Sequence, residues 1–372
     1  MDGAKLLGFC MALALGTSPA RAVEWTVIRH QNRDYVSFKN VADFYRFRDY
    51  SDANRTISLR GEHRGIRARV GASEIYMNGV RFFTYHPLVE NSDGQLVSAF
   101  DVGKLLEPIL RPSRIRDAQR VETVVLDPGH GGTDQGTANS WGSEKAFALD
   151  VALHAREELL RAGFKVEMTR DTDTGLSLEE RVDFANRFSD AVFVSIHFNS
   201  TSGAAGIESY ALAPEGISSS ASEGEEHASD PETRANPGNA QDGLNIALTA
   251  AVHAAVISRV AAYDRGVRPA RFKVLRNIRI PALLLEAGFL NDPAEARRIA
   301  SAEYRQQLGV AIAQGIQNYN TAVNYRSSES TFAVVRTLPP HTKSITEPLH
   351  ADGAVASNAP KEPADPLHGR AP

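Results

Sequence analysis

A strand that ends at a histidine, followed by a glycine-rich loop and a helix, is the feature that most limits how this chain can fold. The stretch is VVLDPGHGGTDQGTANSWGSEK, residues 124–145. Its first residues favour a β-strand, and an Asp-Pro-Gly turn ends that strand at His130. A polar loop then leads to Glu144 at the head of a helix. Both side chains are therefore expected at the edge of a sheet where α/β proteins keep their ligands.

Two later strands end in side chains of the same kind. Residues 191–199, AVFVSIHFN, begin as a continuous apolar strand and carry His197. Residues 282–285 form another apolar run, which ends at Glu286. A carboxylate that closes such a run must be paired, protonated or bound to a ligand. We therefore expect His197 and Glu286 to converge with the pair from the first motif.

Two imidazoles and one carboxylate, with no cysteine, are the ligand set of a catalytic zinc. Such sites keep one coordination position open, whereas structural zinc sites are usually closed by four ligands rich in Cys. His130, Glu144 and His197 are the candidate ligands, and the open position lets the metal activate a water molecule at neutral pH. Glu286, not needed as a ligand, is placed to take the proton from that water and pass it to a leaving amine. That role requires a pKa of Glu286 raised by apolar surroundings. The predicted reaction is metal-assisted hydrolysis of an amide.

Each of these residues also has a purely structural explanation. A histidine at a strand end is often a hydrogen-bonded rim residue, and the helix dipole alone would favour Glu144 at a helix head. Asp127 is expected either to orient His130 or to cap the turn, and the sequence does not separate the two. Three further side chains are expected on the surface, away from the site: Glu208, His154 and His253.

From residue 121 to 325 the predicted strands and helices alternate. This pattern indicates an α/β fold with a mixed central sheet flanked by helices. Helices are expected at 145–161, after a capping box at Ser177, at 244–262, after Asp292-Pro293 and at 304–319, and short strands at 206–212 and 272–275. The acidic insertion 214–243 cannot bury enough apolar surface to order itself and is predicted to be a mobile loop.

Residues 23–120 are expected to form a small α+β accessory module and a linker. Short β-like runs dominate, including a hairpin across Asn78-Gly79, and two short helices are predicted at 41–47, with Asn40 as N-cap, and at 101–106 before Pro108. The order of strands resembles the repeat module named after the N-terminal region of copper amine oxidases, and that resemblance implies no copper here. Its strand arginines are interpreted as solvated surface charge, with contact to an anionic wall polymer as the alternative.

The two ends of the chain have the composition of a leader and a tail. Lys5, the apolar run 6–15 and the Ala20-Arg21-Ala22 site predict a secretory signal peptide over residues 1–22, too short to span a bilayer. The single cysteine, Cys10, lies inside it, so the mature protein would hold no disulfide. Residues 326–372 contain seven of the 18 prolines and are predicted to be disordered. A formal charge of -4 gives no reason to expect nucleic acid as a partner.

Four ordered motifs carry a family resemblance over about residues 121–319. They are LDPGHGGTDQGT with Ser-Glu-Lys after it, RVDFANRFSDAVFVSIHFN, RGVRPARFKVLR and PALLLEAGFLND. Together they resemble the zinc-dependent N-acetylmuramoyl-L-alanine amidases of the AmiC type, amidase family 3. The resemblance implies three zinc ligands and one catalytic carboxylate: His130, Glu144, His197 and Glu286. It implies as substrate the amide between the lactyl group of N-acetylmuramic acid and L-alanine of the peptidoglycan stem.

The resemblance also sets further expectations and leaves alternatives. Phe198, where the family often has Ala, is expected to narrow the groove or to add stacking area. The insertion 214–243 falls where envelope amidases carry a regulatory segment, so an activator protein that acts on it is expected, with the enzyme in the periplasm or cell envelope. The rival functions are a zinc peptidase that cuts within the stem peptide and a catalytically inactive wall-binding protein.

Overall fold

A computed structural model of the chain describes residues 25–201, 203–220 and 233–325. The predicted signal peptide 1–22, the predicted tail 326–372 and the middle of the insertion, 221–232, lie outside the described residues. All described residues belong to one compact unit.

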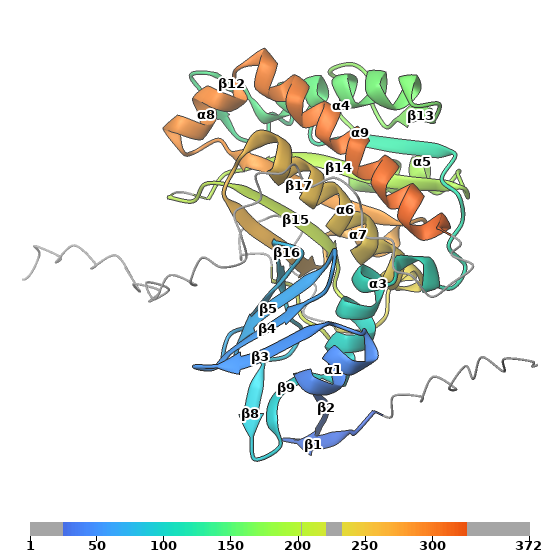
Figure 1. Ribbon diagram of the computed structural model, residues 1–372. Helices are drawn as coiled ribbons and strands as arrows, with labels where there is room; N and C mark the ends of the chain where they lie inside the picture. Colours follow the sequence, from blue (N-terminus) through green and yellow to red (C-terminus); the bar gives the residue numbers. More distant parts are fainter. Residues whose placement is uncertain (1–24, 202, 221–232, 326–372) are drawn as a thin grey trace, which may run out of the picture. The chain divides into compact units, whose positions relative to one another are not determined.

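An 11-stranded mixed sheet runs through this unit (Figure 1). Its C-terminal part has the strand order β13 (Lys165–Met168), β10 (Thr123–Pro128), β14 (Ala191–Asn199), β17 (Ala282–Phe289), β15 (Ile207–Leu212), β16 (Asp264–Ala270). The first four are parallel, and β15 runs antiparallel to β17 and parallel to β16. The predicted α/β fold with a mixed central sheet is confirmed.

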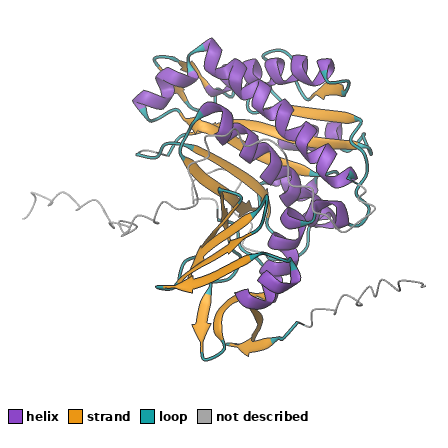
Figure 2. Cartoon of the chain, viewed as in Figure 1, coloured by secondary structure: helices purple, strands orange, loops and turns teal. Residues whose placement is uncertain are grey.

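Helices cover both faces of this part of the sheet (Figure 2). One face packs on the long helices α4 (Glu144–Arg161), α6 (Asp242–Val260) and α9 (Ala302–Asn324), and the other on the short helices α5 (Leu178–Ala185) and α7 (Lys273–Asn277). Helix α8 (Pro293–Ile299) follows β17, with Asp292 as its N-cap as predicted. Every residue of β10 and β17 is buried, as the continuous apolar runs predict.

The stretch Pro237–Val260 consists of the 3-10 turn η3 (Pro237–Gln241) and α6, and by length and composition it is apolar enough to cross a membrane. Within the described residues this is the one such stretch, and 56% of its apolar 18-residue window is buried. Leu248, Val252 and Val256 are fully buried in the cluster that contains α9. The stretch is therefore a core helix of this fold.

The N-terminal strands extend the same sheet. Strand β7 (Val80–Phe83) lies beside β16, and β6 (Glu74–Met77), β5 (Gly65–Arg69), β4 (Thr56–Arg60) and β3 (Asp49–Ala53) follow as antiparallel neighbours. A second sheet has the order β1 (Ile28–His30), β2 (Arg33–Ser37), β9 (Gly94–Ser98), β8 (Val89–Asn91). The helical turns are α1 (Phe38–Phe44), α2 (Ala99–Asp101), the π-helical η1 (Val102–Leu106), α3 (Glu107–Leu110) and the 3-10 turn η2 (Pro112–Arg114). This region has the α+β composition that the sequence predicts.

Three local predictions are wrong. Helix α1 begins at Phe38, because Ser37 and not Asn40 is its N-cap and accepts a hydrogen bond from the Asn40 amide. Pro108 does not end the second helix: the chain passes through the π-helical turn into α3, where a proline near the first position needs no N–H partner. The stretch 272–275, predicted as a strand, enters helix α7, and the strand is β16 before it.

The sequence predicts that the insertion 214–243 is a mobile loop. The structure shows instead that its two ends are ordered. Arg271, which is fully buried, donates from Nε to the carbonyl of Ile217 at 2.9 Å and from Nη2 to that of Pro214 at 2.9 Å. It also reaches the carbonyl of Arg234 at 3.0 Å. These contacts hold the insertion where β15 and β16 end. Because β15 runs antiparallel to β17, this is the opposite end of the sheet from Glu286.

Candidate metal centre

The loop after β10 presents His130 in a strained conformation. His130 has φ of +59°, in the left-handed region that non-glycine residues rarely adopt. Gly129, just before it, lies so close to the next strand that a Cβ there would be 2.3 Å from Cε1 of His197. Only glycine fits at position 129 without moving that imidazole.

Two buried arginines hold this loop through its carbonyl groups. Arg181 of α5 donates to Oδ1 of Asp127 at 2.7 Å and to the carbonyl of His130 at 2.6 Å. Arg170 donates to the carbonyls of Pro128 at 3.0 Å and Gly129 at 2.7 Å. Both side chains are at most 4% exposed. The strained conformation at His130 is therefore fixed by charged donors that water does not reach.

Glu144 is positioned by a small hairpin, β11 (Ala138–Asn139) and β12 (Gly142–Ser143). At its base the Glu144 amide donates to the Thr137 carbonyl at 2.7 Å, and the Thr137 amide donates to Oε2 of Glu144 at 2.9 Å. Gly136 leaves room for the site, because a Cβ there would be 2.5 Å from the same Oε2. The carboxylate is thus held by backbone donors at the first turn of α4.

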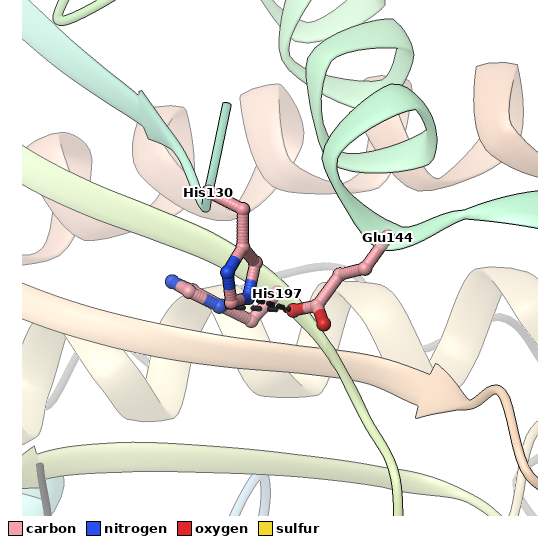
Figure 3. Close-up of side chains that lie close together, drawn as sticks. All are labelled: His130, Glu144 and His197. Carbon is pink, nitrogen blue, oxygen red and sulfur yellow. Dashed lines mark hydrogen bonds and ion pairs between the residues drawn. The ribbon is translucent and has the colours of Figure 1, made fainter. Parts of the chain in front are cut away.

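The three predicted ligands converge (Figure 3). Nε2 of His130 lies 2.9 Å from Oε1 of Glu144, and Nδ1 of His197 lies 3.0 Å from the same oxygen. The two imidazole centroids are 5.0 Å apart. One ligand atom from each residue lies within 4.8 Å of the others, close enough for a single metal ion. The set of two imidazoles and a carboxylate fits zinc.

Charge within the group favours an ionised carboxylate. Burial would raise the pKa of Glu144, but hydrogen bonds from His130 and His197 hold it below its ordinary value. Burial would lower the pKa of His130, but Glu144 and Asp134 outweigh it, so that pKa is raised. Asp134 accepts from Nδ1 of His130 at 2.7 Å, which leaves Nε2 directed at the centre of the group. In metal sites, a carboxylate commonly accepts a hydrogen bond in this way from the ring nitrogen that does not bind the metal.

Glu286 lies beside the group on the neighbouring strand. In the β14/β17 pairing it is the direct partner of His197, so the two side chains project from the same face of the sheet. It is 7% exposed. The prediction that the strand ends at Glu286 is wrong, because β17 continues to Phe289; the register nevertheless brings Glu286 beside His197.

Several predictions about neighbouring residues are wrong. Glu208 is 4% exposed and not on the surface: Arg265 donates to its Oε1 at 2.7 Å, and it is the register partner of Glu286. His253 is fully buried between Ser209, at 2.8 Å from Nδ1, and Asp264, at 2.9 Å from Nε2. The surface prediction for His154 is not contradicted, because its side chain on α4 is 30% exposed and lies 3.8 Å from Asp150.

Phe198 and Asp127 also differ from expectation. Phe198 is 1% exposed and packs edge-on against Phe147 in the core, so it neither narrows a groove nor offers stacking area. Its backbone N–H instead donates to Oε1 of Glu144 at 3.1 Å. Asp127 does not contact the His130 imidazole: its carboxylate binds Arg181, Thr169 and Ser195. Burial would raise the pKa of Asp127, but Arg181 and the hydroxyl donors hold it low.

The chain from residue 124 to 318 matches the Amidase_3 family model, described as N-acetylmuramoyl-L-alanine amidase. This match covers more than half of the 372 residues. The chain belongs to the N-acetylmuramoyl-L-alanine amidase family. It is therefore an enzyme that hydrolyses the amide between N-acetylmuramic acid and L-alanine in peptidoglycan. This assignment favours the amidase over the zinc peptidase and the inactive wall-binding protein.

Individual amidases show the same likeness. The N-acetylmuramoyl-L-alanine amidase AmiA of Escherichia coli is 31% identical over an alignment of 222 residues; the match covers 53% of this chain and 75% of that protein. The sporulation-specific N-acetylmuramoyl-L-alanine amidase of Bacillus subtilis is 31% identical over 209 residues, 56% of this chain and 70% of that protein. Among solved structures, the amidase AmiC2 of Nostoc punctiforme is 31% identical over 54% of this chain and 98% of its own, with a TM-score of 0.44.

Proposed function

We propose that this amidase is a zinc enzyme in which His130, Glu144 and His197 hold the metal and Glu286 is the catalytic carboxylate. The observation that supports the ligand set is the convergence of three ligand atoms within 4.8 Å, from three separate parts of the chain. The donor chemistry, without sulfur and with a second carboxylate behind one imidazole, suits a catalytic zinc. When bound, zinc supplies a Lewis acid that activates water and polarises the amide carbonyl.

The chain's own groups then have distinct tasks. Asp134 fixes the ring orientation of His130 through Nδ1. Backbone donors from Thr137 and Phe198 fix the two oxygens of Glu144. Glu286, the register partner of His197, is placed to take a proton from the attacking water on a carboxylate oxygen and to deliver it to the leaving nitrogen of L-alanine.

A Glu286→Gln variant tests the role of the carboxylate. The amide side chain keeps the volume but cannot accept and return the proton. A positioned acid or base contributes about 10²–10⁴-fold to the rate, so the turnover of isolated sacculi should fall by that order while zinc content stays at the level of the unaltered enzyme. If the variant keeps its zinc and releases stem peptides at the normal rate, Glu286 is not the catalytic group.

Location and regulation complete the proposal. We propose that the enzyme acts in the cell envelope, supported by its peptidoglycan substrate and by the leader-like composition of residues 1–22. We further propose that an activator protein acts through the insertion 214–243. Removal of residues 221–232, which spares the ordered ends around Arg271, should raise basal activity on sacculi. An unchanged basal activity would argue against a regulatory insertion.

A further inference from the structure

One face of the mixed sheet carries polar side chains from the candidate metal centre into the N-terminal strands. On β14, β17 and β15, His197, Glu286 and Glu208 are successive register partners. The face continues through Arg268 of β16, which pairs with Tyr210 of β15. It then crosses onto strand β7, which lies beside β16 in the same sheet. The N-terminal region therefore contributes to the same surface as the catalytic groups.

Along β16, β7 and β6, side chains alternate between a buried apolar face of the sheet and the face that carries the polar groups. Val267, Phe82 and Ile75 are 2%, 1% and 0% exposed, respectively, and belong to one hydrophobic cluster. Successive side chains of a strand point to opposite faces, so Arg268 and Phe83 project from the other face. A Cβ on Gly266, opposite β7, would be 2.9 Å from the Phe83 ring, which shows how closely the two strands approach.

The carboxylate nearest to Arg268 is that of Glu208, and both of its oxygens already accept hydrogen bonds from other residues. Glu208 accepts from Arg265 on Oε1 and from the Tyr210 hydroxyl on Oε2, both at 2.7 Å. Nε of Arg268 lies 3.7 Å from Oε1, beyond hydrogen-bond distance. Within the described parts of the chain this buried Nε has no hydrogen-bond partner. Burial also lowers the pKa of Arg268, because the charged form loses hydration.

Phe83 of β7 holds this guanidinium in place. The guanidinium carbon of Arg268 lies 3.9 Å from the ring centroid, and that of Arg81 lies 5.0 Å from it. Cations are attracted to the face of an aromatic ring, and the attraction is larger when the pair is desolvated. Nε of Arg81 donates to Glu74 at 2.6 Å, so its charge is balanced locally. Arg268 shares Oε1 of Glu208 with Arg265 at ion-pair distance, so one carboxylate faces two guanidinium groups and Arg268 is the cation of this group that can take a further anionic partner.

We propose that Arg268, packed on Phe83, binds a carboxylate of the stem peptide and so determines which peptides the amidase accepts. This inference rests on the proposed function. The lactyl carboxyl of muramic acid is consumed in the scissile amide, so nearby negative charge belongs to the peptide. Arg268 is two strands from Glu286 and two residues along, roughly 12 Å between Cα atoms. An extended peptide covers about 3.3–3.6 Å per residue, which brings the residue after L-alanine within reach of the arginine side chain.

Two soluble muramoyl peptides test this specificity: one with glutamate after the L-alanine and one with glutamine. The full-length zinc enzyme should prefer the glutamate peptide. In Arg268→Gln the kcat/KM for that peptide should fall at least tenfold, mainly through KM, and the preference should disappear. Arg268→Lys should retain part of the preference, and Phe83→Leu should reduce it by a smaller factor. Binding of the free stem peptide, measured by calorimetry, should weaken in parallel.

Arg161→Gln is the matched control, because Arg161 is an exposed arginine on α4 that pairs with Glu157 and Glu158. It should leave both constants unchanged. Thermal unfolding of each variant reports whether the fold is retained. The inference is overturned if Arg268→Gln folds and keeps the wild-type preference, or if the unaltered enzyme does not distinguish the two peptides. If instead the proposed function is wrong, neither peptide is cleaved. The difference in calorimetric binding of the stem peptide between the unaltered enzyme and Arg268→Gln would then still be observed.

Discussion

Substitution of Gly129 by alanine tests whether the close packing of this glycine against His197 fixes the position of that candidate ligand. The added methyl would lie 2.3 Å from Cε1 and 2.6 Å from Nδ1 and Nε2 of His197, whereas ordinary contacts begin at 3.4 Å. Because Cβ contacts are essentially never shorter than 3.0 Å, the imidazole must move by at least 0.7 Å, the difference between 3.0 and 2.3 Å, and by 1.1 Å to reach an ordinary contact at 3.4 Å. Gly129 is not among the glycines with positive φ, so an alanine backbone is acceptable there. The effect is steric and acts on one ligand.

A movement of this size exceeds what zinc tolerates, since ligand distances in zinc sites vary by about ±0.2 Å. Loss of orientation at a metal site costs about 10–100-fold in affinity, so the zinc affinity of Gly129→Ala should fall at least tenfold, about 1.4 kcal/mol. Overpacking should cost about 1–3 kcal/mol of stability, which a domain of this size can survive.

Competition with a fluorescent chelator measures the zinc affinity, and circular dichroism measures the fold. Gly103→Ala is the control, because nothing lies within 4 Å of a Cβ at that helical position. Its zinc affinity and activity should match the unaltered enzyme. If Gly129→Ala binds zinc as tightly as Gly103→Ala, the imidazole of His197 is not constrained as described, and the packing argument for the site is refuted.

Three further perturbations address the groups around the site and in the N-terminal region. Asp134→Asn removes the carboxylate behind His130, and the zinc affinity should drop about 10–100-fold by the same chelator assay; an unchanged affinity would remove Asp134 from the site. Arg181→Met leaves Asp127 buried without its cation, and urea unfolding should show a loss of about 3–5 kcal/mol; a loss below about 1 kcal/mol would contradict a structural role for the pair. Burial raises the pKa of Asp101 from 3.8 to about 6, so the folded state binds this proton more tightly than the unfolded state. The Asp101 contribution to the unfolding free energy should therefore fall by about 3 kcal/mol as the pH rises from about 4 to above 6. Urea unfolding across this range should show that Asp101→Asn lacks this decline, and an equal decline in both proteins would refute it.

The sequence allowed prediction of the candidate centre because the informative residues lie where strands and helices meet. His130, His197 and Glu286 each follow an apolar run, and parallel strands bring their carboxyl ends to one edge. Glu144 needed the family pattern, since its helix-head position has a simpler explanation in the helix dipole. The inferences for His130, His197 and Glu286, in contrast, depend on local pattern and sheet direction.

The supporting groups were not predictable in the same way. Arg170 and Arg181 donate to the carbonyls of Gly129 and His130, more than 40 residues away in sequence, and nothing in their local sequence indicates that they are buried. Glu208 was expected on the surface because a carboxylate is rarely fully buried, yet its partners Arg265 and Glu286 come from two other strands. The joining of β7 to β16 likewise depends on a pairing between distant segments. Such contacts are decided by tertiary packing.

The stretch 272–275 shows the limit of local periodicity. Short apolar runs fit a strand or one turn of a helix equally well. Here Val274 and Leu275 are buried from a helical turn, 5% and 1% exposed, against the cluster that covers β14 and β17. The choice between a strand and a helical turn for residues 272–275 therefore depends on where they pack against the folded sheet.

The most direct test of this account combines metal analysis with product identification on purified peptidoglycan. The unaltered protein should contain stoichiometric zinc and release stem peptides that begin with L-alanine, leaving glycan without it. His130→Ala, Glu144→Ala and His197→Ala should each lose zinc and activity together. If all three single variants retain zinc and cleave at the normal rate, the metal is not held by these side chains and the account of the centre is wrong.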